Sequence, residues 1–261
     1  MTATSPQVAA RRSGAKQGAI AVTGTSRGIG AAIALELARR GFTVGCLTRG
    51  GKSFVENPAP PELLPRLLEV TCDVTDDAAI RQALHGVAER GGGLQGLVNN
   101  AGAHIIGPAA EYSTADFQSQ VHIALTSVFV GCREAYPLLR ANGGGLIVNI
   151  GSFFDRVGVK HNAAYCAAKA GVGGLTRSLA VEWGPDGISV LNVAPGYILT
   201  AVNRDYLARE STLKYISSRI PAGAVGTCED VANLVAALYV ENLPYLTGET
   251  ICMDGGHSIS H

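Results

Sequence analysis

The sequence of 261 residues has no excess of charge of either sign, because 21 lysines and arginines balance 21 aspartates and glutamates. It has no long basic run, so it lacks the electrostatic footprint of a nucleic-acid-binding protein. It also contains no uninterrupted apolar stretch of about 18 residues, the length that a transmembrane helix requires. We therefore expect neither a nucleic acid nor a membrane as a partner of this chain.

Disulfide and metal-binding patterns are missing as well. Six cysteines are scattered along the chain, and none of them forms a Cys-x-x-Cys pair. Most lie in apolar stretches, so we expect reduced thiols in the core. No spacing of histidine, aspartate and glutamate is typical of a metal site. This cysteine usage predicts a reducing, cytoplasmic location.

The apolar content is sufficient for one large core, since hydrophobic residues make up 47% of the chain. Residues 1–17 are polar and lack the apolar segment of a secretory signal, so they are expected to form a flexible tail. Residues 18–261 are expected to form a single domain.

The first motif is a glycine-rich turn between an apolar run, residues 19–23, and a helical pattern, residues 31–40. Glycines let the backbone approach a pyrophosphate, and the N-terminus of the helix presents free N–H groups to it. The spacing is Gly-x-x-x-Gly-x-Gly, not the commoner Gly-x-Gly-x-x-Gly, but the flanking strand and helix favour nucleotide binding. The residues expected at the cofactor are Gly24, Ser26, Arg27, Gly28, Ile29 and Gly30.

The end of the next predicted strand, residues 42–47, indicates which nucleotide binds. An acidic residue at this position binds the ribose 2′-hydroxyl of NAD, whereas an arginine accommodates the 2′-phosphate of NADP. The sequence has Arg49 here and no carboxylate, and Arg27 can reach the same phosphate. It therefore predicts NADP(H), with Arg49 as a solvated loop residue as the alternative.

Apolar runs and helical patterns alternate along the rest of the chain. Strands are predicted at residues 67–72, 94–98, 147–150, 188–193 and 250–253, and helices at 76–90, 162–183 and 234–240. Residues 50–66 are rich in glycine and proline and predict a loop with little helix. The alternation predicts the α/β class, a doubly wound parallel sheet with helices on both faces, and a ligand site at the carboxyl ends of its strands.

A second constellation consists of Ser152, Tyr165 and Lys169. Ser152 follows a predicted strand, and Tyr165 and Lys169 lie four residues apart on one face of a predicted helix. An ammonium lowers the pKa of a nearby phenol, so Tyr165 is expected to exchange a proton at working pH while Ser152 holds a substrate oxygen. Alone, Tyr-x-x-x-Lys is more often a surface pair on a helix, but several motifs converge on the same edge of the sheet.

In combination these motifs resemble the short-chain dehydrogenase/reductase family, and in particular 3-oxoacyl-ACP reductases. The resemblance rests on Thr23-Gly24-x-x-x-Gly28-Ile29-Gly30, Asp73, Asn99-Asn100-Ala101-Gly102, Ser152, Tyr165-x-x-x-Lys169, Pro195-Gly196 with Thr200, and Met253-Asp254-Gly255-Gly256. It covers residues 18–257. It implies one Rossmann-like domain with about seven strands, hydride transfer between a nicotinamide and a carbonyl/alcohol pair, and usually a homotetramer, with a dimer as the alternative.

The resemblance also implies roles for individual residues. The residue matching Tyr165 donates the proton, the one matching Lys169 lowers its pKa and binds the nicotinamide ribose, and the one matching Ser152 positions the substrate. The further cofactor contacts that it implies are Asp73 and Val74 at the adenine, Asn100, Ala101 and Gly102 at the adenosine ribose, and Pro195, Gly196, Ile198 and Thr200 near the nicotinamide.

The substrate side is expected to be partly aromatic, which favours an apolar or extended substrate. The residues expected there are His104, Phe153, Phe154 and Tyr197, under a lid formed by residues 200–220. Packing beneath the lid explains the two phenylalanines equally well, and a loop histidine without a catalytic role explains His104.

The chain departs from the family pattern at Ala124, where an asparagine usually organises a water that leads to the lysine. His122 lies about 200° away on a regular helix and is not expected to replace it. Three interpretations stay open: a slower relay through other waters, a different proton route, and weak catalysis. The favoured function is an NADP(H)-dependent reductase of a ketone, such as a 3-oxoacyl thioester or a sugar-derived carbonyl. The alternative is a non-catalytic NADP(H) sensor, which only Ala124 supports.

Overall fold

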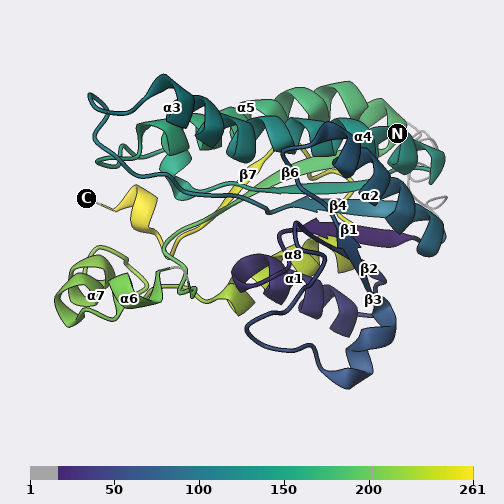
Figure 1. The fold of residues 1–261 in the computed structure, drawn as a ribbon, viewed down its shortest axis with the longest axis horizontal. Coiled ribbons are helices and arrows are strands. Elements are labelled where there is room, and N and C mark those ends of the chain that lie inside the picture. The colour runs from purple at the N-terminus through teal and green to yellow at the C-terminus, as the bar shows by residue number, and fades with distance from the viewer. Residues whose placement is uncertain (1–16, 202, 261) are drawn as a thin grey trace, which may run out of the picture.

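The computed structural model describes residues 17–201 and 203–260, and a seven-stranded parallel sheet forms its centre (Figure 1). Along the sheet the strands are β3 (Leu67–Thr71), β2 (Val44–Thr48), β1 (Ala19–Thr23), β4 (Leu94–Asn99), β5 (Gly145–Ile150), β6 (Ile188–Pro195) and β7 (Thr250–Met253). The chain moves outward from β1 through β2 to β3 and then returns to β4. This reversal opens a crevice at the carboxyl ends of β1 and β4, where ligands of such sheets bind.

Helices cover both faces of the sheet, as the alternating pattern predicted (Figure 1). One face carries α1 (Gly28–Arg39) and α8 (Cys228–Val240), and the other carries α2 (Asp77–Arg90), α3 (Thr114–Val121), α4 (Ser127–Ala141) and α5 (Ala163–Trp183). Alternate strand residues point into separate cores: Ile20 packs with α1 and α8, whereas Ala21 packs with α2, α4 and α5. Because both faces of the inner strands are buried, these strands are mainly apolar runs, whereas the edge strands β3 and β7 are only partly buried.

Three local predictions differ from the structure in their bounds or in the type of helix. The loop predicted at residues 50–66 ends in a 3-10 helix, Pro61–Arg66. The predicted helix 234–240 begins earlier, at Cys228, because Thr227 and Asp230 form a reciprocal capping box. The helix before β5 is not regular, since a π-helical turn, His122–Thr126, joins α3 to α4.

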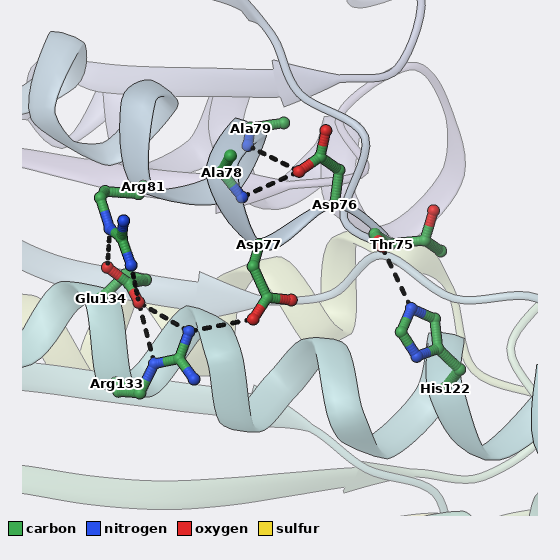
Figure 2. A network of polar contacts seen from close by, with 9 residues as sticks. All are labelled: Thr75, Asp76, Asp77, Ala78, Ala79, Arg81, His122, Arg133 and Glu134. Atoms are coloured by element: carbon green, nitrogen blue, oxygen red, sulfur yellow. Dashed lines mark hydrogen bonds and ion pairs between the residues drawn. The ribbon is translucent and has the colours of Figure 1, made fainter.

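Polar contacts join α2 to α4 near this turn, and Figure 2 shows them. The Arg81 guanidinium donates to the Glu134 carboxylate at 2.7 Å, and Arg133 donates to Asp77 at 3.1 Å. Hydrogen bonds from Arg81 are the main cause that lowers the pKa of Glu134. The network therefore fixes α4, which directly follows the π-helical turn with Ala124, against α2.

Two segments of the expected organisation fall partly outside the described residues. These are the predicted tail, except for Gln17, and position 202 of the predicted lid. The described part of the lid contains α6 (Arg204–Leu207) and α7 (Glu210–Ser217), and buried Ile216 and Ile220 anchor α7. Across residues 17–201 and 203–260, no helix has the length and apolar content for a membrane crossing.

Candidate active site

The glycine turn between β1 and α1 forms a cradle for an anion. Gly24 and Gly28 have φ angles of 76° and 60°, a left-handed conformation that favours glycine. Arg27, the N-cap of α1, makes no side-chain hydrogen bond to the helix, which leaves the first N–H groups free of a side-chain cap. Ser26 and Ile29 are half-buried in the same turn. The turn therefore fits the pyrophosphate of a dinucleotide.

The loop after β4 is fixed against this turn. The Thr23 hydroxyl accepts hydrogen bonds from the backbone N–H groups of Asn100 and Ala101, each at 2.9 Å. The Asn100 side chain donates to the Thr23 carbonyl oxygen, also at 2.9 Å. Asn100 and Ala101 therefore lie in the crevice between β1 and β4, and the exposed Gly102 follows them.

Gly30 provides a direct test of this cradle. A Cβ at this position would lie 2.3 Å from the Gly24 carbonyl oxygen and 2.4 Å from Asn100 Nδ2. We expect Gly30→Ala to lower the unfolding free energy by about 1–3 kcal/mol and to weaken NADPH binding, because the turn must shift. Urea melts and fluorescence titration measure both effects.

The matched control is Gly86→Ala in α2, where a Cβ would meet no atom within 4 Å. It should leave NADPH binding unchanged and stabilise the helix by up to about 1 kcal/mol. Equal effects of both substitutions would contradict the proposed close packing at Gly30.

The residues predicted for the adenosine end lie at the carboxyl ends of β2 and β3. Hydrogen bonds from the N–H and hydroxyl of Thr75 to Asp73, at 3.0 and 2.7 Å, hold the pKa of Asp73 below its usual value, and the charge of nearby Arg49 adds to this effect. Val74 is half-buried beside Asp73. Arg27 lies 3.8 Å from the Glu56 carboxylate. That exposed pair is weak, so Arg27 can still reorient toward a phosphate.

A segment that sequence reasoning missed also contacts the glycine turn. The backbone N–H of Phe54 donates to the Thr25 carbonyl oxygen at 3.1 Å, and that of Val55 donates to the Ser26 carbonyl at 2.9 Å. The Ser53 hydroxyl hydrogen-bonds to the Thr25 hydroxyl at 2.8 Å. These contacts are made largely by the backbone, so no residue pattern could have indicated them.

The side chains of Ser152, Tyr165 and Lys169 meet beyond the carboxyl end of β5. The Ser152 hydroxyl and the Tyr165 phenol form a hydrogen bond. Lys169 Nζ lies 5.6 Å from the centre of the Tyr165 ring and donates to the Ile150 carbonyl oxygen at 2.7 Å. Three polar groups from β5 and α5 thus face one space.

The pKa of Tyr165 differs from the expectation. Burial raises it to about 12, and the hydrogen bond from Ser152 offsets only part of that rise. Burial also lowers the pKa of Lys169 to about 8. The prediction of a lowered phenol pKa was therefore wrong for the protein alone, because desolvation outweighs the effect of an ammonium that is bonded to Ile150. At neutral pH Tyr165 holds its proton and can donate it.

Aromatic rings border Tyr165 on the substrate side. The centre of the His104 ring lies 4.3 Å from that of Tyr165, and the centre of the Phe154 ring lies 5.9 Å from it. Asn162 hydrogen-bonds to the His104 ring, although its position directly before α5 predicts a helix cap. Sequence reasoning missed this contact because 58 residues separate the two partners.

The remaining predicted aromatic residues extend this cluster. Phe153 lies 4.7 Å from Phe154 and 5.2 Å from Tyr197, measured between ring centres. His257, which was not predicted, lies 5.1 Å from Phe153 and 5.6 Å from Tyr197. No local signal distinguishes His257 from a surface histidine.

The residues expected near the nicotinamide follow β6. Pro195 ends the strand and Gly196 packs against Asp254, where a Cβ would lie 2.7 Å from the Asp254 Cα. A Cβ at Gly28 would lie 3.8 Å from the Thr200 methyl group, so Thr200 lies beside the glycine turn. Ile198 is buried.

Ala124 is buried in the π-helical turn, and its methyl group provides no hydrogen bond. His122 Nε2 lies 3.2 Å from the Thr75 carbonyl oxygen, on the side of α2 (Figure 2). The ring of His122 therefore does not take the place of the family asparagine. Within residues 17–201 and 203–260, no group of three or more potential ligands could hold a metal ion.

The fold and the glycine cradle define a dinucleotide-binding α/β protein with a polar site beside the cradle. A family profile described as enoyl-(acyl carrier protein) reductase matches residues 24–258. The chain belongs to the short-chain dehydrogenase/reductase family.

Individual relatives differ in the activities that their names state. A tropinone reductase homolog of Arabidopsis thaliana is 37% identical over 92% of this chain and 90% of its own length. 3β-hydroxysteroid dehydrogenase 1 of Eggerthella lenta is 33% identical over 92% and 93%.

Two solved structures resemble the whole chain. One, provisionally described as a short-chain alcohol dehydrogenase of Sinorhizobium meliloti, is 33% identical with a TM-score of 0.87, over 94% of this chain and 98% of its own. The other, provisionally described as a 2-deoxy-D-gluconate 3-dehydrogenase of Agrobacterium tumefaciens with bound NADP, is 33% identical with a TM-score of 0.81, over 93% and 96%.

Proposed function

We propose that this protein is an NADP(H)-dependent oxidoreductase that reduces a ketone to a secondary alcohol. The observation that carries the proposal is the meeting of Ser152, Tyr165 and Lys169 at the carboxyl edge of the sheet that also carries the glycine cradle. A nicotinamide cofactor would supply the hydride when bound. The cradle residues and Asn100 to Gly102 would hold its phosphates and adenosine ribose, and Ile198 and Thr200 would lie near its carboxamide.

The chain's own residues account for the proton. Tyr165 donates its phenolic proton to the carbonyl oxygen as hydride reaches the carbonyl carbon, so that oxygen becomes the hydroxyl of the product. Ser152 hydrogen-bonds the same oxygen and orients it. The positive charge of Lys169 stabilises the phenolate that Tyr165 leaves behind. A proton from bulk solvent then converts the Tyr165 phenolate back to the phenol.

The substrate side supports an apolar or extended ketone. The rings of His104, Phe153, Phe154 and Tyr197 border the space beside Tyr165, and residues 200–220 would close over it as a lid. A 3-oxoacyl thioester and a sugar-derived ketone both fit this description. By family resemblance we further propose a cytoplasmic homotetramer or dimer.

NADP(H) preference follows from Arg49 and Arg27, with no carboxylate at the end of β2. We expect NADPH to bind about 10- to 100-fold more tightly than NADH, the effect of a charge-assisted hydrogen bond to the 2′-phosphate. Arg49→Ala should remove most of this preference, whereas Arg39→Ala at the exposed end of α1 should not. Fluorescence titrations of the wild type and the two variants with NADPH and NADH measure the six affinities. Equal binding, or tighter NADH binding, would contradict the assignment.

A panel of ketones tests the activity itself. Steady NADPH consumption with acyl thioesters, cyclic ketones or sugars, lost in Tyr165→Phe, supports the reductase. Tight NADPH binding without turnover of any of these ketones would favour the alternative, a non-catalytic NADP(H) sensor. The apolar Ala124 at the position of the family asparagine is the observation that supports this alternative.

A further inference from the structure

An open hollow of ≈ 340 Å³ lies outside the Ser-Tyr-Lys site, between α7 and the C-terminal turn. Its lining residues are Ser218, Arg219, Pro221, His257 and Ser260. In Figure 1, α7 and the C-terminal turn lie together at the left, beyond the carboxyl ends of β6 and β7. This is the same end of the sheet that carries the site.

Arg219 is the charged group of this hollow, and it has no anionic partner. Among the described residues, no carboxylate lies within ion-pair distance of its guanidinium, which stacks on the Tyr215 ring at 5.0 Å. The Ser260 hydroxyl donates to the Arg219 carbonyl oxygen at 3.1 Å, so the C-terminal turn fixes this backbone. A held, unpaired guanidinium suits a carboxylate.

Among residues 17–201 and 203–260, the other charged groups around the hollow do not oppose an anion. His257 contributes an imidazole whose Nδ1 is buried without a hydrogen-bond partner in the described chain. The nearby carboxylate of Asp254 accepts hydrogen bonds from the N–H groups of Gly256 and Ser258, at 3.0 and 2.8 Å. It is therefore satisfied within its own turn and does not line the hollow.

A row of rings connects the hollow to Tyr165. His257 lines the hollow and contacts Tyr197, Tyr197 contacts Phe154, and Phe154 contacts Tyr165. The ring centres lie 5.6 to 6.4 Å apart at each step, and all four rings are half-buried. A ligand lying along these rings would have one end at Tyr165 and the other beside Arg219. The spacing suits an extended molecule with an apolar middle.

We propose that this hollow is a subsite for the carboxylate of the substrate, so that the reduced ketone is an extended keto acid. The inference rests on the proposed ketone reductase activity and deepens it. Arg219 binds the carboxylate, the rings cover the apolar chain, and the carbonyl lies at Tyr165. Arg219 contributes to binding of the substrate, so its removal should raise KM and leave kcat unchanged.

The test compares keto acids of increasing chain length with their methyl esters, in the presence of NADPH. For the best length we expect wild-type kcat/KM to favour the acid over the ester by about 10- to 100-fold, through KM. Arg219→Ala should lose this preference while ester reduction stays unchanged, and Arg219→Lys should keep part of it. Arg39→Ala, at the exposed end of α1 and outside both the hollow and the predicted lid, is the control.

Three outcomes would overturn the subsite while ketone reduction survives: equal rates for acid and ester, equal losses for both in Arg219→Ala, or the same loss in Arg39→Ala. A calorimetric titration of the NADP⁺-loaded protein with the keto acids separates the two proposals. Binding that depends on Arg219 would support the subsite, and if no keto acid and no ketone of the panel is turned over, the reductase is contradicted. Absence of keto acid binding would contradict the subsite alone if another ketone of the panel is reduced, and both proposals if none is.

Discussion

Tyr165→Phe is expected to lower kcat for ketone reduction by about 10²- to 10⁴-fold, the usual contribution of a positioned general acid. The substitution removes the phenolic oxygen and keeps the ring. That ring packs against His104 and Phe154, so stability and NADPH affinity should change little. Stopped-flow or steady-state NADPH oxidation measures kcat, and thermal melts and titration provide the controls.

The raised pKa of Tyr165 supports its role as the proton donor in ketone reduction. With a pKa of about 12 the phenol stays protonated through neutral pH, the form that donates during reduction. A Tyr165→Phe variant with near wild-type kcat would show that another group, or water, supplies the proton. Loss of NADPH binding together with kcat would instead indicate that the phenol positions the cofactor.

Lys169→Met is expected to abolish turnover while leaving the protein at least as stable as wild type at pH 7. The folded pKa of Lys169 is about 8 and its ordinary value is 10.5. The unfolded chain therefore binds more protons between these pH values, and stability rises as the pH increases through them. Below pH 8 the buried ammonium costs about 3 kcal/mol, which methionine removes. Loss of the bond to the Ile150 carbonyl offsets about 1–3 kcal/mol of that gain.

Urea melts at pH 7 and pH 9.5 test this prediction. The stability of Lys169→Met relative to wild type should fall by about 2 kcal/mol between these values, because the wild type loses its penalty as Lys169 deprotonates. Exposed Lys214→Met in α7 should show no such change. If the unfolding free energies of wild type and Lys169→Met depend on pH in the same way, burial does not lower the pKa of Lys169. A kcat of Lys169→Met above a hundredth of the wild-type value would contradict the proposed role of the Lys169 charge in catalysis.

The sheet could be predicted because its five inner strands are mostly buried on both faces and therefore appear as short, mainly apolar runs. The boundaries that were wrong depend on polar detail. Reciprocal bonds between Thr227 and Asp230 begin α8 earlier than its apolar pattern suggests. The π-helical turn at His122–Thr126 inserts an extra residue into a pattern that sequence alone treats as a regular helix.

The candidate site was predictable to the extent that its residues follow strands or share a helix face. Tyr165 and Lys169 lie one helical turn apart, and parallel strands bring Ser152 and the glycine turn to one edge. The pairing of His104 with Asn162, and of His257 with Phe153, depends on segments far apart in the chain. No spacing in the sequence encodes such contacts.

The sequence by itself determined the family, the parallel sheet and the residue types available for proton transfer, because these follow from local periodicity and short motifs. Only the tertiary structure decided the electrostatic state of Tyr165 and Lys169, the ring cluster around them and the unpaired Arg219 beside His257. The reason is physical: desolvation, ring packing and charge pairing depend on every neighbour in space, and most of those neighbours are distant along the chain.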